Sequence, residues 1–314
     1  MNPRATNNNA DTGRRPPLPE RIFCLGSATV DVVAGVGQYP QPDTKEEADH
    51  LLVHPGGPAL TAAAFLAHKG CQVHFCGVCG EDLWGQYLQQ EMSRRQIEFI
   101  PTEGDSAPGT NVAMVWVEKK TARRTILWRN TSSVDPPRSL SLEARKVLAS
   151  AAMLYLDGHG GALVSEALEI ARRQGLPVFY DGGSAKKGDD LCLPLVDHLI
   201  VSSRFAEHYF PDLGPREVLN AMAQRWGPFR SLGLTMGEQG SWACREGGMA
   251  EHFPAFPVSA LDTNGAGDIF HGALAWGILS GEGWKQIWQE ATRLAAESTT
   301  INGGGIAWID QNLT

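Results

Sequence analysis

The sequence lacks the features that mark membrane-spanning, secreted and nucleic-acid-binding proteins. Its 314 residues contain no uninterrupted apolar run near the roughly 18 to 20 residues that a membrane-spanning helix needs. Lys and Arg number 27 against 35 Asp and Glu, which gives a net charge of −8 without any basic block. This acidic balance argues against a nucleic-acid partner and against a membrane surface. An anionic small substrate stays open, because a pocket can be locally basic inside an acidic shell.

Cysteine is also scarce. Six Cys in a chain of this length do not make a disulfide framework, and we expect a cytoplasmic protein. Cys76 and Cys79 have CxxC spacing, but no second ligand pair follows as a structural zinc site requires. We interpret these cysteines as small apolar residues of a strand. Residues 1–20 are rich in Asn, Pro and Arg without the apolar segment of a secretory signal, and they predict a disordered tail.

Glycine and a regular alternation of elements are what the sequence does have. Gly makes up 35 of the 314 residues, above the usual share of about 7%, which indicates tight turns and close backbone approaches to ligands. Buried-strand patterns alternate with helix patterns. The strands are expected at 21–26, 72–78, 153–156, 177–180, 198–201 and 231–235, and the helices at 58–68, 83–95, 163–174, 215–225 and 269–279. This order predicts an α/β fold with a doubly wound, mainly parallel sheet flanked by helices.

Two segments are surplus to that alternation. Residues 111–117 and 124–128 are alternating stretches separated by a polar turn, and they predict a hairpin. Together with residues near 33–53, the segment of about 108–128 is expected to form a small β lid over the active site. We find no internal repeat and no linker, so residues 21–314 are predicted to form one domain.

The strongest functional signal is Asp262-Thr-Asn-Gly-Ala-Gly-Asp268, which leads directly into an apolar helix. Gly265 and Gly267 permit backbone turns that aim successive N–H groups at one point, where the helix dipole adds positive potential. Such a site suits an anion, in particular the charge that develops on a phosphoryl group. Asp268 at its mouth suits a base that takes a proton from an attacking hydroxyl. From these residues alone, a helix N-cap is an equally good interpretation of Asp268.

Four motifs in order resemble those of the ribokinase-like (pfkB-type) carbohydrate kinases. Residues 262–268 match the family signature DTxGAGD, and residues 56–70 match its double glycine at the start of an Ala-rich helix. Residues 73–85 and 234–240 are similar to its VxFxGxVGxDxxG and VTxGxxG motifs. The resemblance spans about residues 21–310 and is nearest to the sulfofructose-kinase and ketohexokinase-like branches. It implies transfer of the γ-phosphoryl group of ATP to an alcohol, usually a sugar, with Mg²⁺ and in many members K⁺.

The resemblance also assigns roles to single residues. It implies that Asp268 is the base and that the amides of Gly265, Ala266 and Gly267 form the anion hole. The implied substrate-binding residues are Asp31, Gly57, Thr61, Asp157 and His159. The implied nucleotide-binding residues are Ser202, Thr235, Gly237, Gly240 and a loop near the adenine from Asn302 to Gly305. Asp262 and Asn264 match the positions that hold the monovalent cation.

Several positions depart from the family pattern. Thr29 and Thr61 replace Asn residues near the sugar, which argues against ribose as the substrate. The N-x-x-E motif that helps to arrange Mg²⁺ and phosphates is Ser202-Ser-Arg-Phe205 in this chain. Magnesium can still be held largely by ATP phosphates and water, so this change does not exclude activity. Asn264 replaces the usual Thr at the cation position.

The charge of the substrate is a separate question. His159 falls where the sulfofructose-kinase branch has an Arg that faces an anionic group of the substrate. Arg124 and Arg129 on the predicted hairpin are the other candidate cations, and each is as readily a solvated surface charge. His159 therefore weakens the case for an anionic sugar relative to a plain ketose, and an inward-facing Arg129 would restore it.

Three functions fit these observations. The first is an ATP-dependent ketose or related sugar kinase, and the second is a kinase of the same fold that acts on a nucleoside or another alcohol. The third is a catalytically silent binding protein, but such a protein has no need for Asp268 in its GAGD loop. The sequence does not separate the first two. Lid strands pair between subunits in many members of the family, which implies a homodimer through the lid.

Overall fold

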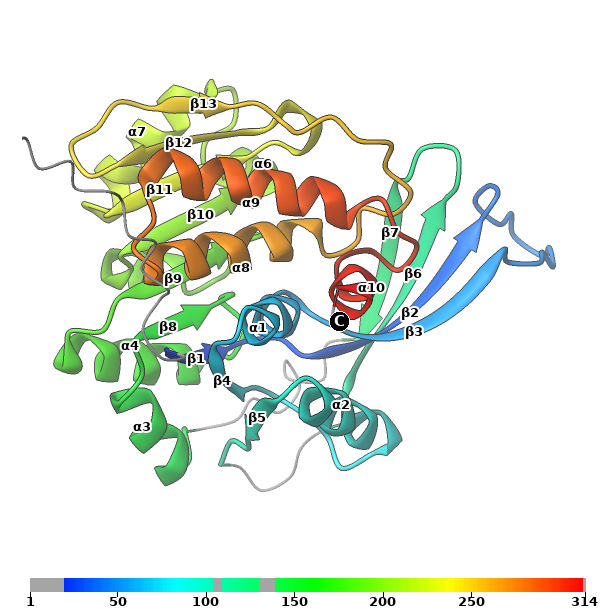
Figure 1. The fold of residues 1–314 in the computed structure, drawn as a ribbon, viewed down its shortest axis with the longest axis horizontal. Coiled ribbons are helices and arrows are strands. Elements are labelled where there is room, and N and C mark those ends of the chain that lie inside the picture. Colours follow the sequence, from blue (N-terminus) through cyan, green and yellow to red (C-terminus); the bar gives the residue numbers. More distant parts are fainter. Residues whose placement is uncertain (1–19, 104–108, 130–138, 313–314) are drawn as a thin grey trace, which may run out of the picture.

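The computed structural model describes residues 20–103, 109–129 and 139–312. Its larger sheet has nine strands (Figure 1). From one edge to the other they are β13 (Glu251–Phe253), β12 (Ser241–Arg245), β11 (Ser231–Thr235), β10 (His198–Ser202), β9 (Val178–Gly182), β8 (Met153–Leu156), β1 (Arg21–Leu25), β4 (Gln72–Cys76) and β5 (Ile97–Ile100). The strands from β11 to β5 are all parallel, and β12 and β13 are added antiparallel. The predicted doubly wound, mainly parallel sheet is thus confirmed.

Helices cover both faces of this sheet, which is why its central strands are buried and largely apolar. Every residue of β8 and β9 is buried. One face carries α1 (Pro58–His68), α2 (Leu83–Arg94), α8 (Ala266–Leu279), α9 (Trp284–Ser298) and α10 (Gly304–Gln311). The other carries α3 (Leu142–Ala149), α4 (Ala162–Gln174), α5 (Asp189–Cys192), α6 (Ser203–Tyr209) and α7 (Pro215–Trp226). Two short 3₁₀ helices, η1 (Leu193–Leu195) and η2 (Gly237–Gln239), complete the described helices.

The helix α8, apolar on nearly every side, is buried as its sequence predicts. It packs between α1 and α9 in addition to the sheet (Figure 1). A helix surrounded in this way has no solvent face to fill with polar residues. Among the described residues, none of the helices combines the length and the hydropathy that crossing a bilayer requires.

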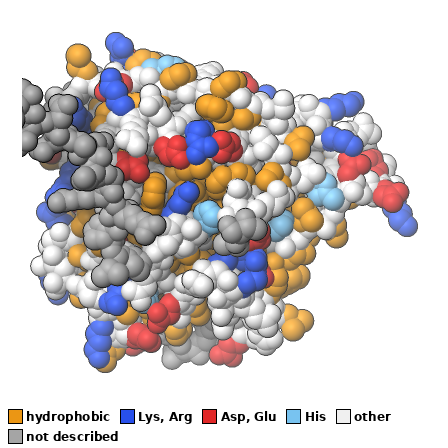
Figure 2. Space-filling view, in the orientation of Figure 1, with side chains coloured by type: hydrophobic (Ala, Val, Ile, Leu, Met, Phe, Trp, Pro, Cys, Tyr) orange, Lys and Arg blue, Asp and Glu red, His pale blue; other side chains and the backbone are white. Residues whose placement is uncertain are grey.

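A second sheet of four strands forms the lid. Its order is β3 (His50–Gly56), β2 (Thr29–Val36), β6 (Asn111–Glu118) and β7 (Arg124–Arg129). The predicted hairpin is confirmed as β6 and β7, and the segment near 33–53 supplies β2 and β3, although β2 already begins at Thr29. The lid projects to the right in Figure 2, where its tip carries acidic and basic side chains together. Residues 1–19 of the predicted tail and residue 108 of the predicted lid lie outside the described residues.

Packing between β11 and α9 gives a direct test of the core. A β-carbon on Gly233 would lie 2.3 Å from the indole of Trp288, which is 1% exposed and has no room to move away. Gly233→Ala should therefore lower the free energy of unfolding by about 1 to 3 kcal/mol. Urea denaturation with an unchanged m-value measures this loss.

Gly37→Ala is the matched control for that variant, because a β-carbon there meets no atom within 4 Å. Its effect on the free energy of unfolding should stay within about 0.5 kcal/mol. If both variants unfold at the same urea concentration as the wild type, the packing of Trp288 against β11 is looser than described.

Candidate active site

A cleft of about 510 Å³ lies between the lid and the carboxyl ends of the parallel strands. Open α/β sheets bind ligands at this edge, because the loops that follow their strands meet there. The cleft is lined from the lid, from the loops after β1, β8, β9 and β10, and from the first turns of α1 and α8. Most of the residues implied by the sequence meet in this cleft.

The inner face of the lid is set by strand register. His54, Asp31, Ala113 and Trp128 are consecutive cross-strand partners on β3, β2, β6 and β7, and all four line the cleft. Because side chains alternate between the two faces of a sheet, Arg124, Ile126 and Trp128 of β7 all face the cleft.

The same alternation corrects one expectation about charge. Arg129 follows Trp128 directly, so it lies on the opposite face of β7 and is not part of the cleft lining. Arg124 is the hairpin arginine that the fold brings to the site. Its Nη1 donates to the backbone oxygen of Thr263 at 3.2 Å and to the hydroxyl of Thr263 at 3.0 Å.

Asp31 is held by the residues around it. It accepts hydrogen bonds from the Thr29 hydroxyl at 2.7 Å and from the Asn264 amide at 3.4 Å. A β-carbon on Gly56 would come within 2.4 Å of its carboxyl group, so this glycine makes room for the carboxylate. Burial raises the pKa of Asp31, and the two hydrogen bonds oppose that rise. Thr61 and Gly57 line the same part of the cleft.

Asp157 joins three segments of the main domain. Its carboxylate accepts the backbone N–H of Ser27 at 2.8 Å, of Ala59 at 3.1 Å and of His159 at 2.9 Å. Burial favours its neutral form, but His159 and these N–H groups outweigh burial and hold the pKa of Asp157 below its usual range. The imidazole Nδ1 of His159 is 3.3 Å from Asp157 Oδ1. Asp157 thus links three backbone segments that border the cleft, and its hydrogen bond with the His159 N–H orients His159.

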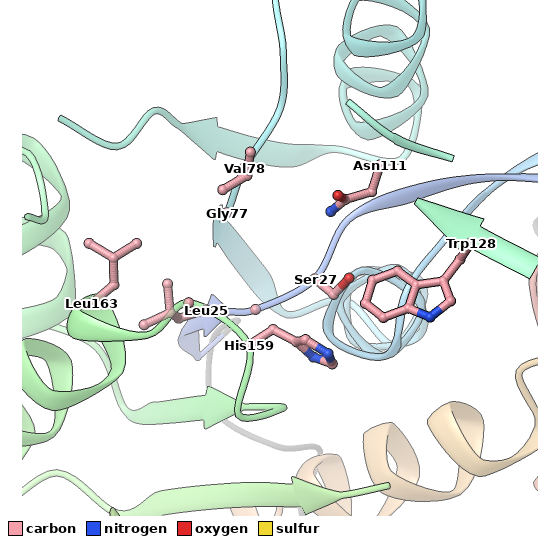
Figure 3. A pocket seen from close by; sticks show the side chains of 10 residues that line it. Leu25, Ser27, Gly77, Val78, Asn111, Trp128, His159 and Leu163 are labelled. Carbon is pink, nitrogen blue, oxygen red and sulfur yellow. The ribbon is translucent and has the colours of Figure 1, made fainter. Parts of the chain in front are cut away.

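His159 and Trp128 close one end of the cleft. Their rings meet edge to face with 6.1 Å between centroids, above a small cavity that Ser27 and Asn111 also line (Figure 3). That cavity has a volume of about 10 Å³, which is room for about one water molecule. The rings of His159 and Trp128 thus form one wall of the cleft, and their ring nitrogens are its polar atoms.

The Gly-rich turn leads into α8 through a left-handed glycine, and the Ala266 N–H that was expected in the anion hole donates to the Thr263 carbonyl at 3.4 Å. Gly265 is the N-cap of α8 in a left-handed conformation with φ of 74°, which glycine adopts without strain. Asp262 fixes the turn because its carboxylate accepts the backbone N–H of Asn264 at 2.8 Å and of Gly303 at 3.1 Å. Gly265 and Gly267 line the cleft, and Ala266 lies between them as the first residue of α8.

The segment from Asn302 to Gly305 differs from the loop that was expected. Gly304 and Gly305 already belong to α10, and the Gly305 N–H donates to the Asn264 carbonyl at 2.8 Å. Gly303 lies against His54 of the lid and lines the cleft, whereas Asn302 does not. The segment therefore supports the Gly-rich turn and the lid, and its assignment to adenine stays a prediction.

Asp268 lies in the first turn of α8 and lines the cleft beside Gly267. Burial, and after it the charge of Asp181, raises the pKa of Asp268. Sequence reasoning missed Asp181, which ends up in the cleft because it lies near the carboxyl end of the buried strand β9. Position after a central parallel strand is the signal that could have found it.

Lys186 and Arg204 are two further cleft residues that sequence reasoning missed. They follow β9 and β10, so they lie on the main-domain side of the cleft. Burial lowers the pKa of Lys186, whereas the charges of Asp157, Asp189 and Asp181 act to raise it. With Arg124 on the lid, these side chains bring three cations to a cleft that also holds the Gly-rich turn.

The predicted nucleotide residues divide into two groups. Ser202 and Thr235 line the cleft at the ends of β10 and β11. Gly237 and Gly240 lie outside the lining and shape the turn around η2, with φ of 56° and 84°. Gly240 lies tightly against the segment after β13, since a β-carbon would be 2.1 Å from the Phe253 oxygen. In the described part of the chain, no three His, Cys, Asp or Glu side chains gather as metal ligands.

Known proteins share the sequence pattern and the fold of this chain. A ribokinase of Lactococcus lactis is 23% identical over 260 residues, which cover 82% of this chain and 83% of that protein. A fructokinase of Klebsiella pneumoniae is 28% identical over 277 residues, with 83% and 85% covered. The structure of Arabidopsis thaliana ribokinase with ribose and ATP shares the fold, with a TM-score of 0.76, 18% identity, and 95% and 99% of the two chains covered. Residues 19–311 match the pfkB family of carbohydrate kinases, and the chain belongs to that family.

Proposed function

We propose that this protein is a kinase that transfers the γ-phosphoryl group of ATP to a hydroxyl of a sugar. The observation that carries the proposal is one cleft in which Asp268 lies beside an anion-binding turn, with Asp31 on the lid and three cations around it. A carboxylate next to a phosphate site repels the phosphates, so its presence there calls for a function, and accepting the proton of the attacking hydroxyl is such a function.

The lid supplies the acceptor side of the site. Asp31 can accept hydrogen bonds from two neighbouring hydroxyls, and Asn264 and Thr29 fix the orientation of its carboxylate. Trp128 and Ile126 cover the sugar from the same face of the lid, which excludes water from the reacting atoms. The binding of the sugar thereby places one hydroxyl toward α8.

The Gly-rich turn and the cations supply the phosphate side. The N–H groups around Gly265 and Gly267 and the N-terminus of α8 face charge that develops on the transferred phosphoryl group. Arg124 reaches from the lid to Thr263, so a closed lid brings its guanidinium to the same turn. Lys186 and Arg204 are available to the remaining phosphates. Asp268 takes the proton as the new oxygen–phosphorus bond forms and the bond to the leaving nucleotide breaks.

The proposal includes two metal ions, Mg²⁺ and K⁺. Mg²⁺ neutralises phosphate charge when it binds with ATP. Ser202 and Phe205 supply no carboxylate where the family has its N-x-x-E motif, so phosphates and water are the expected ligands. Asp262 and Asn264 are the proposed monovalent-cation residues, and K⁺ is the proposed ion. Asp262 keeps free lone pairs for it, because a carboxylate accepts more than the two N–H bonds seen here.

A ketose or a related neutral sugar is the proposed acceptor. Thr29 and Thr61 are smaller than the Asn residues of the family pattern. His159 lies at one end of the cleft, and the charged group nearest to it is Asp157. An anionic substituent would be placed close to that carboxylate.

A kinase of the same fold that acts on a nucleoside is the second candidate. Trp128 is the one described aromatic side chain of the cleft lining that could stack on a base. The cytoplasm, where ATP is available, is the proposed location.

Replacement of the proposed base gives the first test of this function. Asp268→Asn should lower kcat by about two to four orders of magnitude, because the proton acceptor is lost while the turn stays intact. The Kd of MgATP, measured by calorimetry, should stay close to the wild-type value. The assay is coupled ADP formation with a panel of ketoses, aldoses and nucleosides.

Asp190→Asn is the control for that test, since Asp190 is an exposed residue of α5 that pairs with Arg225. It should retain wild-type kcat. Turnover of Asp268→Asn at the wild-type rate would refute the assignment of the base.

The outer face of the lid supports a homodimer. Val53, Val32, Met114 and Leu127 form a cross-strand row on that face, in which Met114 is 47% and Leu127 is 61% exposed. A continuous apolar face of this kind favours association. A second copy of this chain is the proposed occupant, because a flat apolar face is complementary to itself across a two-fold axis. No nucleic-acid or membrane partner is proposed.

Leu127→Lys should convert this dimer to a monomer, because it places a charge in the centre of the apolar contact. Light scattering after size exclusion measures the mass. Leu191→Lys changes a leucine on α5 that is also exposed, at 79%, and should leave the mass unchanged. A wild-type mass of one chain at micromolar concentration would contradict the proposed dimer.

A further inference from the structure

Two carboxylates that line the cleft, one half-buried and one fully buried, lie near the Gly-rich turn, and the proposed reaction uses only one of them. Asp268 comes from α8, whereas Asp181 comes from β9 and is 2% exposed. Burying a carboxylate is costly unless a charge or hydrogen bonds offset the loss of water. Asp181 has no Lys or Arg within ion-pair distance among the described residues, so its retention in the cleft calls for a function.

His271 connects Asp181 to the Gly-rich turn. Its Nδ1 is 2.6 Å from the carbonyl oxygen of Gly267 and 3.4 Å from Asp181 Oδ2. A carbonyl oxygen only accepts, so Nδ1 carries the hydrogen and faces both oxygens. Burial lowers the pKa of His271, which keeps the imidazole neutral at neutral pH. The Nδ1–H of His271 is therefore used by the Gly267 carbonyl, and the imidazole packs against Asp181 without cancelling its charge.

Tyr155 holds Asp181 from the other side. Its hydroxyl donates to Asp181 Oδ2 at 3.3 Å, and its ring stacks on Phe179 of β9 with 5.3 Å between centroids. Both partners of Asp181 are thus buried, neutral and fixed by the core. The side chain is held in place in a setting that leaves its charge largely unscreened.

The charged and titratable groups that face Asp268 come from four elements. They are Asp181 of β9, His271 of α8, Arg124 of β7 and Asp31 of β2. Burial and then Asp181 make the largest contributions to the raised pKa of Asp268, and Asp31 adds to them, whereas His271 and Arg124 oppose the rise. Asp181 is thus the neighbouring group with the largest influence on the proposed base.

Asp181 in turn faces Asp157 after β8, Tyr155 of β8 and Lys186 after β9. Burial and then Asp157 raise the pKa of Asp181, and Tyr155 and Lys186 act against them. Two neighbouring carboxylates with raised pKa values titrate as a pair, because ionisation of one disfavours ionisation of the other.

We propose that Asp181 is a positioning residue that, packed against His271 and held by Tyr155 behind the Gly-rich turn, sets through its charge the pH above which Asp268 can accept the hydroxyl proton. This inference rests on the proposed kinase function. It assigns to Asp181 no contact with the reacting atoms. The proton moves from the sugar hydroxyl to Asp268, and the charge of Asp181 makes Asp268 a stronger base for it.

The test is the pH dependence of kcat/KM for the sugar at saturating MgATP, in the wild type and in Asp181→Asn. A raised pKa means that the base is ionised only at higher pH, so the wild-type rate should fall on the acid side already above the usual carboxyl range. Asp181→Asn removes the neighbouring charge, which should move this acid limb to lower pH by about one unit. The rate on the plateau should fall by less than about tenfold.

Two more variants complete the experiment. Asp189→Asn is the matched control, because Asp189 is also buried and bonded to a tyrosine hydroxyl but does not line the cleft. Its acid limb should stay at the wild-type pH. Asp181→Ser is neutral and smaller, and it should give the same shift as Asp181→Asn if the latter does not fold.

An acid limb that stays in place in both Asp181 variants would overturn the proposal. Loss of activity at every pH would also overturn the proposal, because it would place Asp181 among the reacting groups. Recovery of activity at high Mg²⁺ would overturn it as well, because Asp181 would then be a metal ligand. Carboxyl ¹³C NMR of aspartate-labelled protein, with Asp268→Asn to assign the signal, follows Asp268 without turnover. If the wild type phosphorylates no sugar, the proposed function fails, but a lower pKa of Asp268 in Asp181→Asn would still support the pairing.

Discussion

The confinement of negative charge is the constraint on which the rest of this structure depends. Asp268, Asp181, Asp157 and Asp31 line one cleft that the proposed function fills with phosphates. Three of the carboxylates are offset by different means: backbone N–H groups at Asp157, the Tyr155 hydroxyl at Asp181, and polar side chains at Asp31. The pKa values of Asp181 and Asp268 are both raised, so these two carboxylates hold a proton more readily than an ordinary aspartate.

The elements that carry these groups are fixed in two different ways. The carboxyl ends of β8, β9 and β10 are anchored by helices on both faces, so Asp157 and Asp181 are rigid parts of the core. The lid has only a small core of its own, formed by Val33, Ala113, Val115 and Val117. Asp31 and Arg124 therefore belong to the part that can move when ligands bind, and Arg124 bonded to Thr263 is the contact through which the lid reaches the Gly-rich turn.

The parts of this structure that sequence could predict are those that local pattern determines. The alternation of elements predicts the parallel sheet and the hairpin, and the spacing of glycines predicts the turn before α8. Residues such as Asp181, Lys186 and His271 carry no such pattern, because their meeting depends on strand order and helix register across 90 residues. Arg129 was a wrong expectation for the cleft for the related reason that one step along β7 reverses the direction of a side chain. The helices α3, α9 and α10 were not predicted at all.

The altered N-x-x-E segment shows how this chain redistributes charge. Phe205, at the position of the family glutamate, is fully buried against Tyr209 and Trp226 in the core between the sheet and α7. Removal of that carboxylate takes one negative charge away from the phosphates, and Arg204 adds a positive charge to the lining one residue earlier. The main-domain side of the cleft is therefore more favourable to a polyanion than the family pattern would make it.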